Sequence, residues 1–202
     1  MEQQEIIKLA EPDRKGGLTV LEAFANRRAY RGGISLKNIT DQELSNLLWA
    51  ANGRNRPDGL RTAPSALNAQ DIDVYAIMAQ GAYKYDAAKH ELVLISSGDY
   101  RKAAGGGQDF VADVPVVLVL AADYAKYEGA AAHMGFDMST MVPGMAAMDA
   151  GIVSQNINLF CAGSGLATIT RGLMDQIVLK EALKLKDSQH LLLNNAVGYP
   201  EE

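Results

Sequence analysis

One apolar stretch, from Pro143 to Gly165, constrains the fold of this chain more than any other feature. Apolar or small residues fall on every face of a helix drawn through it, and its one formal charge is Asp149. A helix without a charged stripe is normally buried on all sides. The stretch is too short, and too polar between residues 155 and 158, to cross a bilayer. We therefore predict a buried helix that ends at Gly163 and Gly165. Other parts of this chain, or a second subunit, would pack against it.

The length and charge of the chain narrow the class of protein. With 202 residues and 48% hydrophobic composition, it is most simply one globular domain over residues 1–202. A net charge of −5 and the absence of a basic run argue against nucleic acid as the main partner. No segment has the length and hydropathy of a membrane span, and no signal peptide opens the chain, so we expect a cytoplasmic protein without a membrane partner. A chain from which a signal peptide had been removed would look the same.

Several common kinds of site are not indicated. The three histidines, His90, His133 and His190, lie far apart without ligand spacing, so we predict no metal site. The single cysteine, Cys161, cannot form an internal disulfide and fits a small buried hydrophobe. No serine-hydrolase elbow or phosphate-binding P-loop motif is present. Residues 163–168 imitate half of a dinucleotide-binding fingerprint, but they follow a helix where that motif requires a strand.

The remaining patterns predict a mixture of helices and strands. Residues 1–18 read as an extended lead-in, and Ser/Thr-x-x-Glu capping boxes at Thr19–Glu22 and Thr40–Glu43 each start an amphipathic helix. Residues 54–70 form a long irregular loop, which is more often functional than idle. We expect a half-buried strand at 73–78, a hairpin over 83–95, a fully buried strand at 114–122, an amphipathic helix at 173–184 and a final strand at 191–197. This order lacks regular βαβ alternation, so the predicted class is α+β.

Two constellations could bind a ligand. Three guanidiniums, Arg27, Arg28 and Arg31, leave the end of the first helix, and such forks suit phosphate oxygens and planar carbonyl edges. A solvated basic face would explain the same pattern. The second constellation is residues 64–70, Pro-Ser-Ala-Leu-Asn-Ala-Gln, where an asparagine can donate to and accept from a heterocycle edge. A turn with local hydrogen bonds would explain that pattern equally well.

Taken in order, these motifs resemble the nitroreductase-like family of flavin oxidoreductases. The resemblance rests on Arg-Arg-x-x-Arg at 27–31, Leu-Leu-x-Ala-Ala at 47–51 and Pro-Ser-Ala-x-Asn-x-Gln at 64–70. Ala-x-Met-Asp-Ala-Gly at 146–151, Gly-Leu-Ala-Thr at 165–168 and Val-Gly-Tyr-Pro at 197–200 follow in the same order. The hairpin at 81–92 resembles the SagB-type dehydrogenase branch. The resemblance covers nearly the whole chain.

The resemblance implies an α+β fold with a central antiparallel sheet flanked by helices, and an intertwined homodimer with FMN between its subunits. No catalytic side chain is implied, because the flavin N5 carries the chemistry. Residues Arg27 and Ala29 would lie at the phosphate and ribityl chain, and Arg28 and Arg31 at the ribityl or pyrimidine side. A cation near the N1 and O2 edge stabilises negative charge that develops there, and Arg31 is the candidate for it. The other implied FMN contacts are Pro64, Ser65, Ala66 and Asn68 from the partner subunit, and the backbone N–H groups of Arg171 and Gly172 at the N5 and O4 edge.

Two departures from the family pattern bear on how the phosphate is held. Serine is usual in the family where this chain has Ala29, and a hydroxyl donor is thereby lost. Many members also place Lys or Arg after the Gly-Tyr-Pro segment, whereas this chain ends in Glu201 and Glu202. The affinity for FMN would then be lower, or Arg27 and Arg171 would supply more of the neutralising charge.

The activity implied is hydride transfer from NAD(P)H to the flavin and onward to an electron-poor small-molecule acceptor. Within the enzymes, the alternative is an azoline-type dehydrogenase acting on a modified peptide, indicated by the tyrosine-rich hairpin. Outside the enzymes, the alternative is a flavin-binding protein without turnover, indicated by the missing phosphate-binding groups. The sequence leaves open the acceptor and the choice between NADH and NADPH.

Overall fold

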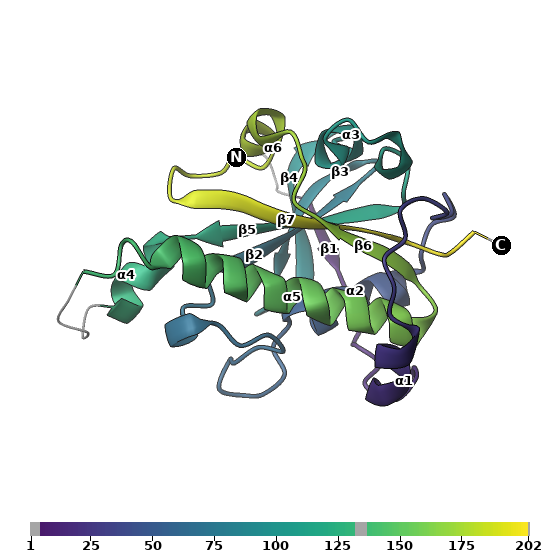
Figure 1. The fold of residues 1–202 in the computed structure, drawn as a ribbon, viewed down its shortest axis with the longest axis horizontal. Helices are drawn as coiled ribbons and strands as arrows, with labels where there is room; N and C mark the ends of the chain where they lie inside the picture. Colours follow the sequence, from purple (N-terminus) through teal and green to yellow (C-terminus); the bar gives the residue numbers. More distant parts are fainter. Residues whose placement is uncertain (1–4, 132–136, 202) are drawn as a thin grey trace.

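The computed structural model describes residues 5–131 and 137–201, and in this part of the chain the centre is a seven-stranded sheet (Figure 1). Every hydrogen-bonded pair of neighbouring strands is antiparallel, in the spatial order β1-β4-β3-β2-β5-β7-β6. The strands are β1 (Ile6–Lys8), β2 (Ile72–Met78), β3 (Gly81–Asp86), β4 (Glu91–Ser97), β5 (Val116–Asp123), β6 (Ala167–Arg171) and β7 (Gln189–Gly198). The predicted α+β class with a central antiparallel sheet is confirmed.

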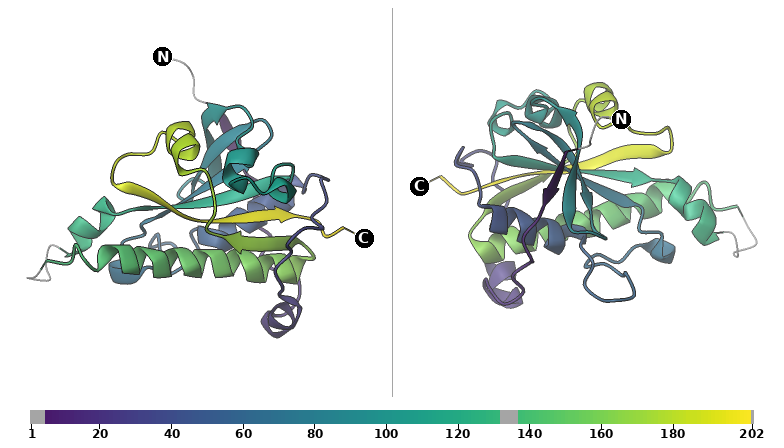
Figure 2. Two further views of the ribbon diagram at one scale, coloured as in Figure 1. Left: turned by 45° about the horizontal axis from the view of Figure 1, so that its top comes forward. Right: turned by 180° about the vertical axis from the view of Figure 1, so that it is seen from behind.

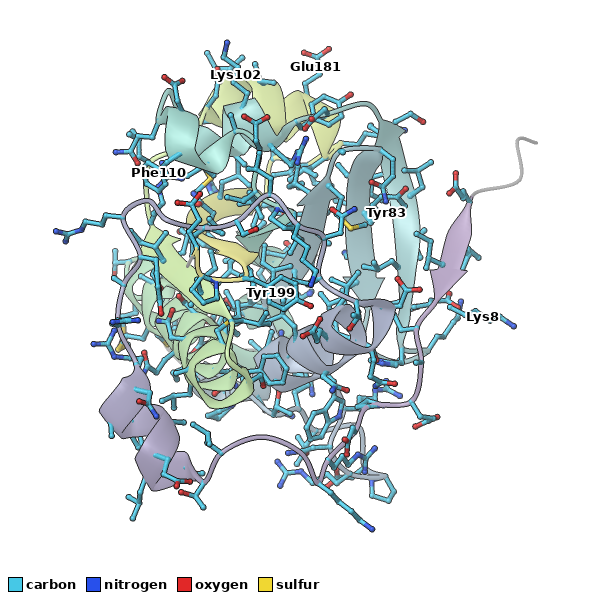
Figure 3. The ribbon with its side chains drawn as sticks, turned by 90° about the vertical axis from the view of Figure 1, so that its right-hand side faces the viewer. Lys8, Tyr83, Lys102, Phe110, Glu181 and Tyr199 are labelled. Carbon is cyan, nitrogen blue, oxygen red and sulfur yellow. The ribbon has the colours of Figure 1, made fainter. Side chains whose placement is uncertain are left out.

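Helices cover both faces of the sheet. Figure 3 shows Lys102 and Glu181 on the same side of the sheet, and the helices that carry them, α3 and α6, pack there, while α1, α2 and α5 lie on the other side. The helices are α1 (Val20–Asn26), α2 (Asp41–Asn52), α3 (Arg101–Gly105), α4 (Ala125–Ala131), α5 (Val142–Ser164) and α6 (Gln176–Ala182), with short 3-10 turns η1 (Ala66–Asn68) and η2 (Asp109–Val111). Both predicted capping boxes are present, at Thr19 with Glu22 and at Thr40 with Glu43.

The residues of strand β5 explain why helices pack on both faces of the sheet. Its even-numbered residues from Val116 to Ala122 enter the core beneath α2 and α5, and its odd-numbered residues from Val117 to Ala121 enter the core beneath α3 and α6. Side chains alternate across a strand, so an unbroken apolar run requires an apolar layer on each face. The fully buried strand predicted for this stretch is confirmed.

Helix α5 is the longest element and packs on strands β2, β5, β6 and β7, with α4 near its N-terminal end and α1 near its C-terminal end (Figures 1 and 2). It ends as predicted at Gly165, which adopts the left-handed conformation (φ 74°) and donates its N–H to the carbonyl of Cys161. Cys161 is buried and unpaired, as expected of a small hydrophobe. One face of α5 is buried against the sheet and α2. The opposite face carries exposed residues, among them Gly144, Met148 and Gly151.

Two local predictions were wrong, and one strand was not predicted. Strand β2 is buried along its whole length, because Tyr75 and Ile77 pack in the core beneath α3 and α6 and Asp73 is enclosed by charged partners. The predicted helix at 173–184 begins only at Gln176, where Asp175 accepts two backbone N–H groups as its cap, and it ends at Ala182. Residues 167–171 form the edge strand β6, which the sequence pattern did not reveal.

Candidate active site

The segment of arginines is held at the C-terminal end of α5. Helix α1 ends where the N–H of Arg27 donates to the carbonyl of Ala23 at 2.9 Å. Three residues later, the N–H of Tyr30 donates to the carbonyl of Thr168 at 3.1 Å, so the segment runs beside β6. Because α1 and β6 both pack on α5, these bonds fix the position of residues 27–30.

An open pocket of about 640 Å³ adjoins this segment. Arg27 is exposed at its wall, and the Arg28 guanidinium lies 4.9 Å from the centre of the Tyr30 ring while its Nε donates to the Tyr30 hydroxyl at 2.9 Å. Ala29 and Arg31 are exposed but do not line the pocket. The remaining wall is supplied by α1 and the residue before its cap, by the end of α5, by the start of β6 and by the C-terminal segment: Leu18, Ala25, Asn26, Asn158, Ala162, Gly163, Gly165, Leu166, Thr168 and Pro200.

The C-terminal segment passes close to the same arginines. Pro200 pairs with Ile34 in an isolated β-bridge, and the N–H of Glu201 donates to the carbonyl of Gly33 at 2.9 Å. An acidic residue therefore stands near the basic segment. Glu202 lies outside the described residues.

A cluster of uncharged polar side chains beside the pocket was missed by the sequence reasoning. The Thr170 hydroxyl lies 2.7 Å from the Ser154 hydroxyl and accepts from the amides of Asn158 and Asn195 at 3.0 and 3.1 Å. Asn158 also lines the pocket. The available signal was an amide within an otherwise apolar helix. Such a cluster can donate to and accept from a polar ligand without adding charge.

The loop at 64–70 is held in an unusual backbone conformation. Leu67, Asn68 and Gln70 have positive φ angles of 54°, 52° and 48°. The Ser65 hydroxyl accepts the N–H of Gln70 at 2.8 Å, and the N–H of Ala66 donates to both carboxylate oxygens of Asp149 at 3.1 and 2.9 Å. Left-handed backbone at residues other than glycine persists only where surrounding contacts impose it, and it concentrates at functional sites. The exposed residues of this loop include Pro64 and Asn68.

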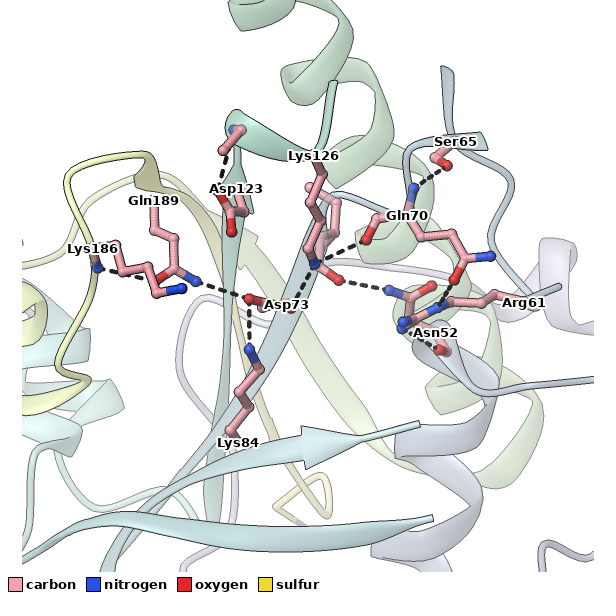
Figure 4. A network of polar contacts seen from close by, with 12 residues as sticks. Asn52, Arg61, Ser65, Gln70, Asp73, Lys84, Asp123, Lys126, Lys186 and Gln189 are labelled. Atoms are coloured by element: carbon pink, nitrogen blue, oxygen red, sulfur yellow. Dashed lines mark hydrogen bonds and ion pairs between the residues drawn. The ribbon is translucent and has the colours of Figure 1, made fainter. Parts of the chain in front are cut away.

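A charged network anchors the other end of the loop (Figure 4). Gln70 accepts from Arg61 Nε at 2.9 Å through its side chain and from Lys126 Nζ at 3.1 Å through its carbonyl. Lys126 continues to Asp73 Oδ1 at 3.0 Å, and Lys84 binds the other oxygen of Asp73 at 2.8 Å. Burial alone would raise the pKa of Asp73, but Lys126 and Lys84 outweigh burial and hold that pKa below its ordinary value. The loop is thus tied to α4 and to the sheet.

Arg171 is the last residue of β6 and Gly172 follows it. The guanidinium of Arg171 is hydrogen-bonded away from the pocket beside Arg27. It is buried against α3, where it donates to Gln108 Oε1 at 2.9 and 2.7 Å and to the carbonyl of Gly105 at 2.6 Å. Burial lowers the pKa of Arg171. Its side chain does not line the pocket beside Arg27, so it is not placed to share a phosphate there. Gly172 is exposed, and a Cβ built on it would meet nothing within 4 Å.

The two constellations predicted from the sequence are not brought together within one chain. Helix α1, which leads into the arginine segment, packs at Gly163, and Gly163 lines the same pocket as Arg27 and Arg28, whereas the loop at 64–70 is bonded to Asp149. Fourteen helical residues separate these points, which at 1.5 Å per residue places them about 21 Å apart along α5. Each chain therefore presents two separate groups of candidate ligand-binding residues, one toward each end of the long helix.

Metal-binding and membrane-spanning features are absent from the described ranges. Within residues 5–131 and 137–201 no three His, Cys, Asp or Glu side chains lie close enough to hold a metal ion. His133, one of the three histidines considered above, lies outside these ranges. None of the described helices combines the length and the hydropathy that a bilayer crossing requires.

Comparisons with known proteins identify the family of the chain. The model of the nitroreductase family matches residues 24–199. The chain is 30% identical over 181 residues to a Methanocaldococcus jannaschii protein described as a nitroreductase, covering 85% of this chain and 87% of that protein. It is 33% identical to a crystal structure described as a nitroreductase from Ralstonia eutropha JMP134, with a TM-score of 0.85 over 98% of this chain and 90% of that one.

A more distant structure shares the fold. The NADPH:FMN oxidoreductase of Vibrio harveyi in complex with NAD+ is 20% identical, with a TM-score of 0.64 over 91% of this chain and 69% of that chain. The family match over most of the chain, the relatives at 30% identity and above, and the shared fold lead to one conclusion. The chain belongs to the nitroreductase family and is an oxidoreductase.

Proposed function

We propose that the protein is a homodimeric FMN-dependent oxidoreductase that draws hydride from NAD(P)H and reduces an electron-poor organic acceptor. The observation that carries the proposal is the separation of the two half-sites along α5. A single chain presents the arginine segment and the loop at 64–70 about 21 Å apart. A two-fold axis crossing α5 near its middle would place the arginine segment of one subunit beside the loop of the other, and would do so twice.

The surface of α5 supports a second subunit on that axis. Its outward face carries Gly144, Met148 and Gly151, and a Cβ built on either glycine would meet nothing within 4 Å. Met148 is 63% exposed, and α1 adds Leu21 at 79% and Phe24 at 55%. Small residues permit a close approach of two helices, and an uncharged apolar surface of this length is typical of an obligate interface.

The residues of each half-site suit FMN. Arg27 and Arg28 present charged donors for a phosphate at a pocket of about 640 Å³. Asn158 and the hydroxyl cluster behind it offer neutral partners for a polyol chain. We assign the pyrimidine edge to Arg31 and the N5 and O4 edge to the backbone N–H groups of Arg171 and Gly172. Pro64, Ser65, Ala66 and Asn68 of the other subunit would complete the site.

When bound, FMN would supply the hydride chemistry, and the chain would only bind, orient and electrostatically tune it. The charge on Arg27 and Arg28 would neutralise the phosphate, and the loop that turns left-handed at Leu67 and Asn68 would meet the neighbouring subunit. The Vibrio harveyi structure that shares the fold is named an NADPH:FMN oxidoreductase, which supports a nicotinamide nucleotide as the hydride donor. The assignment to the SagB-type branch remains a prediction from the sequence.

Anaerobic stopped-flow mixing of the FMN-loaded protein with NADH and with NADPH tests the proposal. Rapid bleaching of the flavin absorbance by either nucleotide, followed by reoxidation with a nitroaromatic or quinone acceptor, is the expected result. An oxidised flavin that neither nucleotide bleaches would contradict the reductase function. That result would leave a flavin-binding protein without turnover or a dehydrogenase of a modified peptide.

A further inference from the structure

Two buried aspartates face one another beneath the loop at 64–70. Asp71 stands just before β2 and is fully buried, while Asp149 on α5 is 3% exposed. Neither carboxyl oxygen of Asp71 accepts a hydrogen bond from any donor among the described residues. Its carboxyl group interacts instead with that of Asp149, and two carboxyl groups can share a hydrogen bond only when one of them carries a proton.

The Asp149 carboxylate is the group that touches the loop. Both of its oxygens accept the N–H of Ala66, at 3.1 and 2.9 Å, and Oδ2 also accepts the hydroxyl of Tyr127 at 2.8 Å. The bond to Ala66 is made directly before Leu67 and Asn68, where the backbone turns left-handed. A charged acceptor on a rigid helix is therefore the contact that fixes where this turn begins.

No cation balances this pair of acids. None of the ion pairs within residues 5–131 and 137–201 includes Asp71 or Asp149, and the nearby Lys126 binds Asp73 instead. The titratable groups that face the Asp71 side chain are the Asp149 carboxylate from α5, Tyr127 from α4 and Tyr124 just before α4. The end of β5 contributes a backbone contact, in which the N–H of Asp123 donates to the carbonyl of Asp71 at 3.0 Å. Burial first, and then Asp149, raise the pKa of Asp71 to about 7.

We propose that Asp149 is a positioning residue that holds the loop at 64–70 in its ligand-presenting conformation, and that the proton shared with Asp71 keeps Asp149 in place. When Asp71 loses that proton, two like charges meet in a site without a cation, and repulsion displaces Asp149 from the N–H of Ala66. The consequence for FMN rests on the proposed function. The consequence for the loop does not, because Ala66, Asp149 and Asp71 belong to one chain.

Amide hydrogen exchange at Ala66, read by NMR in the flavin-free protein, tests the loop directly. A backbone N–H binds a charged acceptor more strongly than a neutral one, and Asp149→Asn leaves only a neutral acceptor for the N–H of Ala66. This variant should therefore lower the exchange protection of the Ala66 amide by about tenfold. In the wild type, protection corrected for intrinsic exchange should fall as the pH rises through about 7. In Asp71→Asn it should stay constant, because the new amide donates to Asp149 at every pH.

Asp175→Asn is the matched control. Asp175 also accepts two backbone N–H groups, from Ile177 and Val178, but it caps α6 on the other face of the sheet. This variant should leave the protection of Ala66 and its pH dependence unchanged. An Ala66 amide that is indifferent to Asp149→Asn, or a wild-type pH profile that matches Asp71→Asn, would overturn the inference.

FMN titration by fluorescence quenching separates the inference from the proposed function. The wild type should lose FMN affinity as the pH rises through about 7, and Asp71→Asn should lose less over the same range. If the wild type does not bind FMN at any pH while Ala66 responds as expected, the proposed function fails and the positioning role of Asp149 stands. If FMN binds equally well to wild type and Asp149→Asn, Asp149 does not position the flavin half-site.

Discussion

The N–H of Leu18 donates to the carbonyl of Gly163 at 2.9 Å, and this bond ties the start of α1 to the last turn of α5. Gly17 adjoins the same carbonyl with a φ of 87°, so that a Cβ there would lie 3.1 Å from the Gly163 oxygen. The arginine segment that follows α1 is thereby fixed at one end of the long helix. The distance between the two half-sites is a property of rigid elements and not of a mobile loop.

Replacement of Arg27 should weaken FMN binding more than any other single change in the arginine segment. Arg27 is the exposed guanidinium at the pocket that is free of the Tyr30 contact made by Arg28, and the chain has Glu201 where the family has a basic residue. Losing a charge-assisted contact to phosphate costs about 2–5 kcal/mol in a buried site, so Arg27→Ala should raise the Kd for FMN by at least about tenfold. Fluorescence titration of the flavin-free protein measures this.

Two comparisons sharpen the Arg27 prediction. Arg27→Lys should restore part of the affinity, because an ammonium keeps the charge and loses the bidentate fork. Riboflavin, which has no phosphate, should bind wild type and Arg27→Ala almost equally. An equal loss for riboflavin and FMN would show that Arg27 does not hold the phosphate.

A charge introduced on the outward face of α5 should dissociate the dimer. Gly151 is exposed in the single chain with open space around it, so Gly151→Arg fits the isolated fold and clashes only with a second subunit. Sedimentation velocity should report a monomer with native circular dichroism and lost FMN binding. Ile177→Arg is the control, because Ile177 is 82% exposed on α6 at the other face of the sheet. If the wild-type protein sediments as a folded, flavin-loaded monomer, the proposed homodimer is contradicted.

Asp71→Asn should stabilise the protein above neutral pH. Burial and then Asp149 raise the pKa of Asp71 from 3.8 to about 7, so its favourable contribution is complete below pH 3.8 and is lost as the pH rises to about 7. The difference in unfolding free energy between the variant and the wild type should therefore be small near pH 4 and reach about 2–4 kcal/mol above pH 7. Urea unfolding across this range measures it, and a difference independent of pH would refute the shared proton.

His90 should give the opposite dependence on pH. Its Nδ1 lies 2.8 Å from the Tyr85 hydroxyl, its Nε2 lies 2.8 Å from the Ser45 hydroxyl, and burial lowers its pKa below 6.5. The neutral ring is favoured by the fold, so its contribution is complete above pH 6.5 and is lost as the pH falls below that value. His90→Asn, which tolerates the φ of 53° at this position, should flatten the acid limb of the stability profile by about 1 kcal/mol.

The sequence was sufficient where local chemistry decides the structure. Thr19 and Thr40 start helices because each has a glutamate three residues later, and Gly165 ends α5 because the left-handed cap suits glycine. The alternating β5 positions required helices on both faces. The family resemblance also predicts both candidate ligand-binding segments, at 27–31 and 64–70.

The sequence was insufficient where contacts join distant residues. Asp73 has the pattern of a solvent-facing residue, and only the fold surrounds it with Lys84 and Lys126. The sequence offered Arg171 as a source of neutralising charge for a phosphate, yet carbonyl groups of α3 accept from its buried guanidinium. The approach of Asp71 to Asp149 joins residues that are far apart in the sequence. No periodicity or propensity reports such a contact, because it depends on how the sheet and α5 pack.

Subunit complementation tests the shared site most directly. Arg27→Ala and Asn68→Ala each damage a different half-site, so either homodimer should bind FMN weakly. If each site combines the arginine segment of one subunit with the loop of the other, a heterodimer of the two variants regains one intact site and one doubly damaged site. Unfolding and refolding the variants together at equal amounts should then restore about a quarter of the high-affinity FMN sites. A refolded mixture of dimers that binds FMN no better than the separate variants would contradict a site built from two subunits.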